Sequence, residues 1–155
     1  RGRRPRGLCP PRQPLGSGGA VRLAAFARAQ DIALQLDNLY RYDAAAGLAQ
    51  VAVAQDEIAV ALEALQCVLV DLAGGGRLDS ADSPRLVRLV CYQVLARAGD
   101  ARAADVLADA HAELQAKAAT ITDATLRQSF LNNVPEHRDI VAAWMARQGA
   151  SAGPC

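Results

Sequence analysis

The sequence has few aromatic residues and few histidines: of its 155 residues, three are Tyr, two Phe, one Trp and two His. Neither His111 nor His137 has a Cys or a second His three or four positions away, whereas a zinc site needs three or four such ligands. The cysteines also lack the CxxC spacing of metal and redox motifs. We therefore expect no metal and no cofactor, and we expect free thiols, which are typical of a reducing cytoplasm.

Motifs of catalysis and membrane insertion are also missing. No GxxxxGK[ST] sequence occurs, so no phosphate-binding loop of that type is predicted. Gly74-Gly75-Gly76 follows an apolar helical stretch and is interpreted as its C-terminal cap. Charges interrupt every apolar run well before the length of a membrane span, and Ser129 has no His–Asp arrangement nearby. These absences favour a non-catalytic cytoplasmic protein without membrane contact, and a stand-alone enzyme is the least favoured class.

Alanine, about a fifth of the residues, dominates what is present. Because Ala is the best helix former and lets helices approach closely, an all-α fold is predicted. The charge is distributed unevenly, since residues 1–19 hold five Arg and no acid while the remainder is mildly acidic. Their Pro and Gly content predicts a disordered linker for residues 1–19. The alternative is a basic arm that binds nucleic acid, although nucleic-acid readers normally carry their basic face on the folded part.

Apolar residues at spacings of three and four predict seven helices. The first covers residues 20–40, and Tyr42 and Asp43 are expected to end it. The others are expected at 44–54, 57–73, 84–98, 101–119, around Leu126 and Phe130, and from Pro135 to about 147. Asp56, Ser83 and Asp100 are predicted N-caps, and Gly99 fits a left-handed helix C-terminus. The folded domain is therefore predicted at 20–147, followed by a frayed tail at 148–155.

The corners at Asp56 and Asp100 lie 44 residues apart, each between two amphipathic helices. A repeat of this length is typical of solenoids built from helix pairs, so we predict a tetratricopeptide-like array of about seven helices. The last helices carry the bulkiest apolar side chains and are expected to close the array. The residues expected to pack on 101–119 are Leu126, Phe130, Val134, Ile140, Val141 and Trp144.

Charged side chains on the predicted pair 84–98 and 101–119 are the candidate site. Asp105, Asp109 and Glu113 form an acidic ridge at spacings of one helical turn. This ridge is interpreted chiefly as a solvated face; the alternative is that it faces Arg85 and Arg88 or a basic partner. These five residues are the predicted partner contacts, and no catalytic, cofactor or metal residue is predicted.

The segment from Cys91 to Ile140 resembles the C-terminal end of a group of large bacterial regulators. The resemblance rests on Cys-Tyr-x-Val-Leu at 91–95, Gly99-Asp100, Ala110-His111 and the stretch LRQSFLNNVPEHRDI at 126–140; a weaker match begins near Tyr42. In that group an ATP-binding signalling module precedes a long tetratricopeptide-type region. The module is often coupled to an adenylate or guanylate cyclase domain, a transcriptional activator domain or a LuxR-type helix-turn-helix.

The resemblance implies a protein-interaction or effector-sensing scaffold that serves signal transduction or transcription regulation. Its expected partner is another protein or an upstream regulatory domain of the same polypeptide, and nucleic acid is the less favoured alternative. Because an isolated solenoid end exposes the apolar face that a neighbouring repeat would cover, self-association is also expected.

Overall fold

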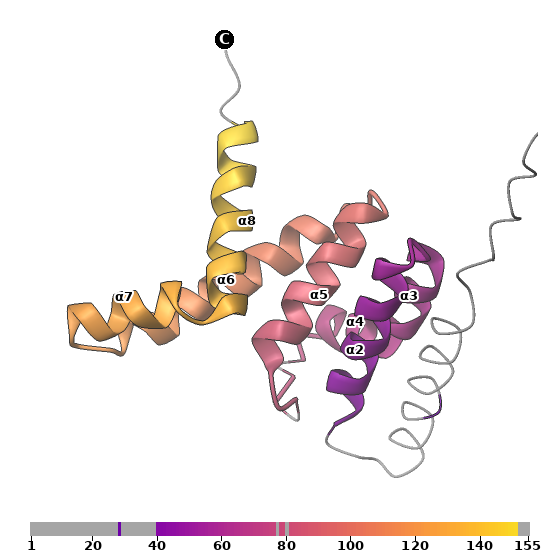
Figure 1. Cartoon of the computed structure of the whole chain (residues 1–155), viewed down its shortest axis with the longest axis horizontal. Coiled ribbons are helices and arrows are strands. Elements are labelled where there is room, and N and C mark those ends of the chain that lie inside the picture. The colour runs from indigo at the N-terminus through magenta and orange to yellow at the C-terminus, as the bar shows by residue number, and fades with distance from the viewer. Residues whose placement is uncertain (1–27, 29–39, 77, 80, 152–155) are drawn as a thin grey trace, which may run out of the picture.

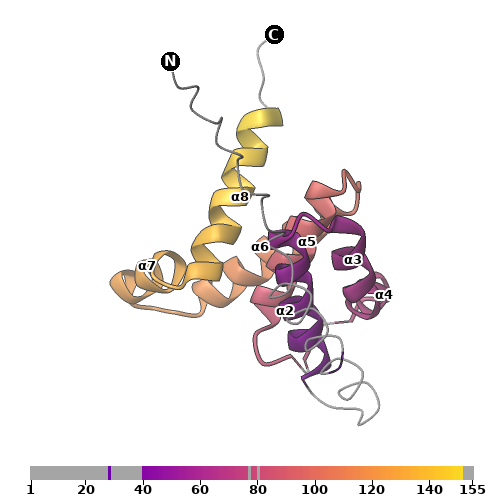
Figure 2. The same ribbon diagram turned by 45° about the vertical axis from the view of Figure 1, so that its right-hand side comes forward.

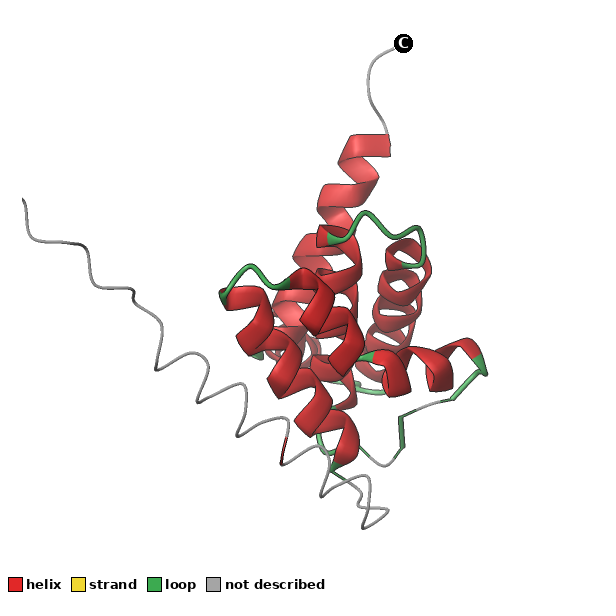
Figure 3. Ribbon diagram, turned by 90° about the vertical axis from the view of Figure 1, so that its right-hand side faces the viewer, coloured by secondary structure: helices red, strands yellow, loops and turns green. Residues whose placement is uncertain are grey.

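The computed structural model describes residue 28 and residues 40–76, 78, 79 and 81–151. This part of the chain forms seven α-helices and no strand (Figures 1 and 3), so the all-α prediction is confirmed for it. The helices are α2 (Arg41–Ala54), α3 (Ile58–Ala64), α4 (Gln66–Ala73), α5 (Pro84–Arg97), α6 (Ala103–Ala119), α7 (Ala124–Asn132) and α8 (Pro135–Ser151).

The start of α2 differs from the prediction. The expected helix at 20–40 lies outside the described residues except for Arg28 and Tyr40, while Tyr42 and Asp43 lie inside α2 and do not break it. Tertiary contacts explain this: the Tyr42 hydroxyl donates to the Asp71 carboxylate of α4, and Asp43 accepts two backbone N–H groups from the loop before α5. Residues that are weak helix formers are thus held in a helix by packing.

The helix expected at 57–73 is divided at Leu65 into α3 and α4. The hydrogen bond from the Leu65 N–H to the Ala61 carbonyl persists, as does that from Leu69 to Leu65, so the change of direction is a bend and not a loop. Leu65 is fully buried at the bend. The apolar stripe runs through this region without interruption, so its periodicity gave no sign of the bend.

Two helix corners have the same backbone geometry, and the prediction for one of them was wrong. Asp56 has φ 61° and Gly99 has φ 69°. At the first corner the Glu57 N–H donates to the Ala52 carbonyl, and at the second Asp100 donates to Leu95 in the same way. This bond pattern is a Schellman motif, in which the left-handed residue follows the helix end. Asp56 therefore ends α2 and is not the N-cap of α3; it corresponds to Gly99, 43 positions later.

The helix N-termini use their predicted residues in different ways. Pro84 is the first residue of α5, but the Ser83 side chain makes no capping hydrogen bond. Asp43 of α2 instead accepts from the N–H groups of Asp82 (2.9 Å) and Ser83 (3.1 Å), which fixes the entry into α5 from a neighbouring helix. Asp123 caps α7 by accepting from the N–H of Leu126.

Two apolar clusters hold the helices together. The larger joins α2, α3, α4 and α5 with the start of α6. On its α2 side it is built from fully or almost fully buried alanines, which let neighbouring helices approach closely. The smaller joins α5, α6 and α8 around Leu107, Leu114 and Ile140, and Tyr92 packs against both clusters. The α5–α6 pair has the most extensive contact in the described part of the chain, in agreement with the predicted pair.

The C-terminal helices pack on the body only in part. Ile140 is fully buried, and Phe130, Val141 and Trp144 are half-buried against the smaller cluster. Leu126 does not pack as predicted, because it is 62% exposed and no residue of α7 is buried. The C-terminal half of α8 projects away from the body (Figures 1 and 2), and α8 continues to Ser151, beyond the expected helix end near 147.

Candidate functional site

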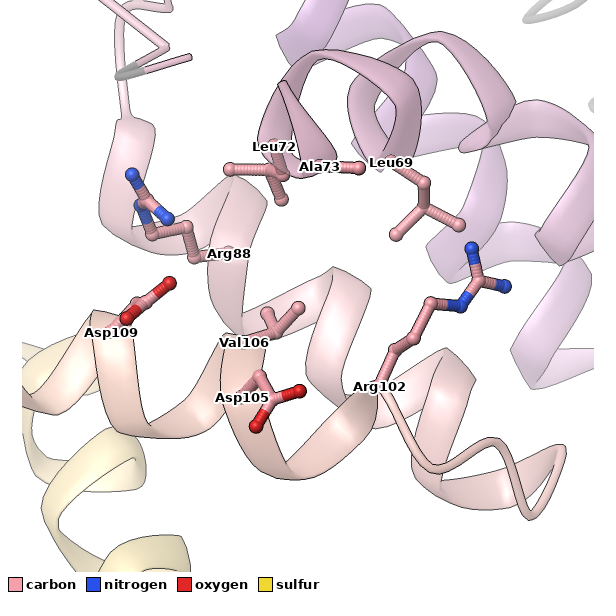
Figure 4. A pocket seen from close by; sticks show the side chains of 8 residues that line it. All are labelled: Leu69, Leu72, Ala73, Arg88, Arg102, Asp105, Val106 and Asp109. Carbon is pink, nitrogen blue, oxygen red and sulfur yellow. The ribbon is translucent and has the colours of Figure 1, made fainter. Parts of the chain in front are cut away.

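A groove between α4 and α6 is lined by three of the predicted site residues. Its volume is about 210 Å³. Figure 4 shows α4 along one side and α6 along the other, with Arg88 of α5 at one end and Arg102 near the other. The lining residues are Leu69, Leu72, Ala73, Arg88, Arg102, Asp105, Val106 and Asp109.

The walls of the groove are mainly apolar. Leu69 and Val106 belong to the buried core at its base, while Leu72 is half-buried and Ala73 is exposed at its edge. The bend at Leu65 and the left-handed Gly75 (φ 78°) bring the end of α4 beside α6. The two helices make no extensive direct contact with each other. The groove is thus the space that two helices leave between them.

Arg88 is a buried cation in the groove wall. Its Nη2 donates to Glu113 Oε1 at 2.8 Å, and the exposed fractions of the two side chains are 5% and 47%. Its Nε has no hydrogen-bond partner among the described residues. Glu113 therefore compensates a charge whose burial would otherwise be costly, and the predicted contact between the acidic ridge and Arg88 is present at this one position.

Arg102 at the groove also has an acidic partner. Its Nε and Nη2 donate to the Asp100 carboxylate at 3.0 and 2.7 Å, a two-pronged arrangement, and its backbone N–H donates to the same carboxylate. This contact lowers the pKa of Asp100 to about 2, chiefly through the Arg102 side-chain hydrogen bond. Asp100 thus holds the arginine just before α6. The sequence predicted Asp100 as the N-cap of this helix, and this prediction was wrong, because α6 begins at Ala103 and its N-cap is Arg102.

Asp105 and Asp109 are the exposed carboxylates of the groove. They lie one helical turn apart on α6, and among the described residues neither forms an ion pair within 4.0 Å. Of the predicted site residues, the groove therefore brings together Arg88, Asp105 and Asp109, with Glu113 paired to Arg88.

Arg85 lies apart from this group. Its guanidinium carbon is 5.8 Å from the centre of the Phe130 ring, and the side chain lines a different surface hollow with Lys117 and Glu113. Sequence reasoning also missed the apolar half of the groove, at Leu69, Leu72 and Val106. These residues appear in the sequence only as members of helical stripes, and no periodicity indicates that two stripes border one groove.

In the described part of the chain, no three His, Cys, Asp or Glu side chains gather closely enough to hold a metal ion. Burial raises the pKa of the Cys91 thiol to about 12, so this cysteine stays protonated and unreactive at neutral pH. His137 is buried, and its Nδ1 lies 2.8 Å from the Phe130 carbonyl oxygen, where it joins α8 to α7.

The part of the chain that the structure describes contains no helix with both the length and the apolar character of a bilayer span. The Arg-rich segment 1–19, the basis of the nucleic-acid alternative, lies outside the described residues. No protein-family model, curated protein or solved structure matches the chain.

Proposed function

We propose that this chain is a non-catalytic scaffold that binds a polypeptide partner in the groove between α4 and α6. The observation that carries the proposal is the groove itself, which combines apolar walls with charged side chains at its rim. A protein-binding surface typically has this layout, with an apolar centre and a polar edge.

The size of the groove favours a protein over a small effector. Pockets for small ligands usually enclose about 300–1,000 Å³, whereas this groove has about 210 Å³. That volume suits one or two side chains of a docked segment, with the rest of the segment lying along α4 and α6. Binding of this kind needs few anchoring residues, because a small central group usually supplies most of the binding energy.

The proposed architecture is a tetratricopeptide-like array. Its support is the correspondence between two helix pairs, α2–α3 and α5–α6, whose corners at Asp56 and Gly99 share one hydrogen-bond pattern. The additional helix α4 lies between the pairs and forms one side of the groove. Arrays of this kind generally bind their partners on the extended concave surface that the stacked repeats create.

The resemblance of residues 91–140 supports a further part of the proposal. The chain would be the C-terminal region of a bacterial signalling ATPase or transcription regulator, acting in the cytoplasm, and occupancy of the groove would be reported to an upstream module. Translation of the genomic reading frame that encodes Arg1 tests this directly. We expect an ATP-binding module upstream, and a full-length reading frame without one would contradict the assignment.

Selection from a phage-displayed library of random peptides tests the docking function. The immobilised chain is used beside Ala73→Trp, which fills the groove edge from an exposed position, and beside Ala142→Trp, which adds the same side chain on an exposed face of α8. We expect enriched peptides that bind the parent and Ala142→Trp equally and lose binding to Ala73→Trp. Failure to enrich any peptide, or equal binding to both variants, would overturn the proposal.

A further inference from the structure

We propose that the groove between α4 and α6 selects a segment that presents an apolar side chain beside two basic residues. This inference rests on the proposed docking function and specifies the chemistry of the partner. Three features of the groove support it: its arginines are paired with acids of the same chain, two of its carboxylates form no ion pair among the described residues, and its walls are apolar.

The two arginines of the groove are already neutralised. Arg88 is paired with Glu113 at 2.8 Å, and Arg102 is paired with Asp100 at 2.7 Å. An acidic partner would have to compete with these carboxylates, and the contact to Arg102 uses two nitrogen atoms at once. Such two-pronged contacts are among the strongest ion pairs that arginine makes. The sites at which these arginines could bind a partner's carboxylate are therefore already filled by the chain's own acids.

The carboxylates of Asp105 and Asp109 are the groove's remaining charges. Taken with the two arginines and their partners, they leave the groove and its rim with a net charge of −2, since Arg88 and Arg102 face Asp100, Asp105, Asp109 and Glu113. An acidic segment would therefore meet repulsion, while a basic segment would gain attraction at the rim.

The spacing of the carboxylates suits a helical partner. Positions 105 and 109 lie one turn apart on α6, which corresponds to about 6 Å along the helix axis. Lysine or arginine residues one turn apart on a second helix have the same spacing. Between them, an apolar side chain would be directed at Leu69, Leu72 and Val106, whose contact supplies the affinity that exposed ion pairs lack.

A polypeptide also supplies an acceptor that the groove wall lacks. Arg88 is buried, and its Nε–H has no hydrogen-bond partner among the described residues. Buried donors are normally paired, and a docked segment carries backbone carbonyl oxygens together with its side chains.

Three labelled peptides of one design test the selectivity. Each is a fluorescein-labelled amphipathic helix of Ala and Leu, whose flanking positions hold Lys in the first peptide, Gln in the second and Glu in the third. Fluorescence anisotropy follows binding to the full chain. We expect the Lys peptide to bind most tightly with one site per chain, the Gln peptide more weakly, and the Glu peptide weakest.

Two double variants with the same change in net charge locate the interaction. Asp105→Asn/Asp109→Asn should weaken binding of the Lys peptide by about tenfold and leave the Gln peptide almost unchanged. Glu63→Gln/Asp139→Asn removes two exposed acids outside the groove and should leave the Lys peptide within about twofold. Equal losses in the two double variants would show general attraction to an acidic surface and would overturn the inference.

The outcomes separate this inference from the docking function. If the Gln or Glu peptide binds as tightly as the Lys peptide and Ala73→Trp abolishes that binding, the selectivity for basic segments is wrong and the groove is still a docking site. If the Lys peptide does not bind, or binds Ala73→Trp as well as the parent, the inference is overturned, while the docking function is decided by the library selection.

Discussion

Asp56, at the corner between α2 and α3, has a backbone conformation that is unfavourable for a residue with a side chain. It has φ 61°, a left-handed conformation that glycine adopts freely and other residues adopt at a cost. The equivalent position at the next corner is Gly99, with φ 69°. The Asp56 carboxylate is exposed and forms no hydrogen bond or ion pair among the described residues, so nothing compensates the conformational cost, which lowers the stability of the chain.

We predict that Asp56→Gly stabilises the chain by about 0.5–1 kcal/mol, because the strain of the left-handed conformation is removed. The matched variant Gly99→Ala should destabilise it by about 1 kcal/mol, since a Cβ at Gly99 meets no atom within 4 Å and only the backbone conformation is unfavourable. Urea denaturation measures both. If Asp56→Gly lowers the unfolding free energy, the aspartate makes a contact that compensates its strain.

Arg88 is a buried charge with a single ion pair. Its guanidinium is compensated by Glu113, and its Nε donor is left without an acceptor. Replacing a buried ion pair by apolar groups often costs nothing, whereas removing one partner leaves an uncompensated group. The two partners should therefore respond unequally to substitution.

We predict that Glu113→Gln costs about 1–3 kcal/mol, because it leaves the buried guanidinium without its anion. Arg88→Met keeps the apolar stem, removes the buried charge and leaves Glu113 exposed to water, so its cost should be under about 1 kcal/mol. Denaturant unfolding at neutral pH compares the two. A larger loss for Arg88→Met than for Glu113→Gln would contradict this account of the pair.

At the scale of elements, an aromatic contact fixes α8 to α6. The His111 and Trp144 rings stack with centroids 4.7 Å apart and an interplanar angle of 10°, and the His111 Nε2 lies 3.3 Å from the Gln115 amide nitrogen. Burial lowers the pKa of His111 from its ordinary value of 6.5. The neutral imidazole is therefore the form that this contact favours.

The lowered pKa makes the contact sensitive to pH in a defined direction. Since the unfolded chain binds the His111 proton more tightly, stability is fully present above pH 6.5 and is lost as the pH falls through the lower folded-state pKa. We predict that the parent loses more unfolding free energy between pH 7.5 and 5 than His111→Leu does. Fluorescence of Trp144, the single tryptophan, follows both unfolding curves. Equal losses in the two proteins would show that His111 does not titrate as proposed.

How far the elements follow from the sequence depends on whether their cause is local. The apolar spacing of α5 and α6, Pro84 at the start of α5 and Gly99 at its end gave the pair correctly, because these signals act within one helix or one turn. Asp43, Asp56 and Leu126 were interpreted wrongly. The environment of each is set by a distant segment or by the path of the backbone. The spacing of residues along the chain carries no information about either.

The candidate site shows the same division. The sequence placed Asp105, Asp109 and Glu113 on one ridge, and the Arg88–Glu113 contact was among its alternatives. Leu69 and Leu72 were missed, because a groove arises where α4 ends beside α6 and its lining comes from three helices. The bend at Leu65 sets that arrangement, and it leaves no mark in the periodicity.

At the scale of the whole molecule, stability is distributed unevenly. α5 contributes Val87, Val90, Cys91, Val94 and Leu95 to the larger cluster and Leu89 to the smaller one. At the C-terminal end, α7 has no buried residue and Met145 of α8 is 67% exposed. If each helix pair is stabilised mainly by its neighbours, as in a repeat array, the ends should open more easily than the centre.

Native-state hydrogen exchange tests this distribution together with the variant Ile140→Ala. In the parent we predict that amides of α5 have the highest opening free energies and those of α7 and the end of α8 the lowest, because backbone groups with few buried contacts open locally.

Ile140 is fully buried between α8 and its neighbours, so truncation leaves a cavity and should cost about 2–4 kcal/mol. In an array, that loss appears in α7 and α8, while the amides of α2 and α3 keep most of their protection. A single cooperative domain would instead lose the same opening free energy at every slowly exchanging amide, from α2 to α8. That result would contradict the array, because the truncation would then reach helices that the smaller cluster does not contain.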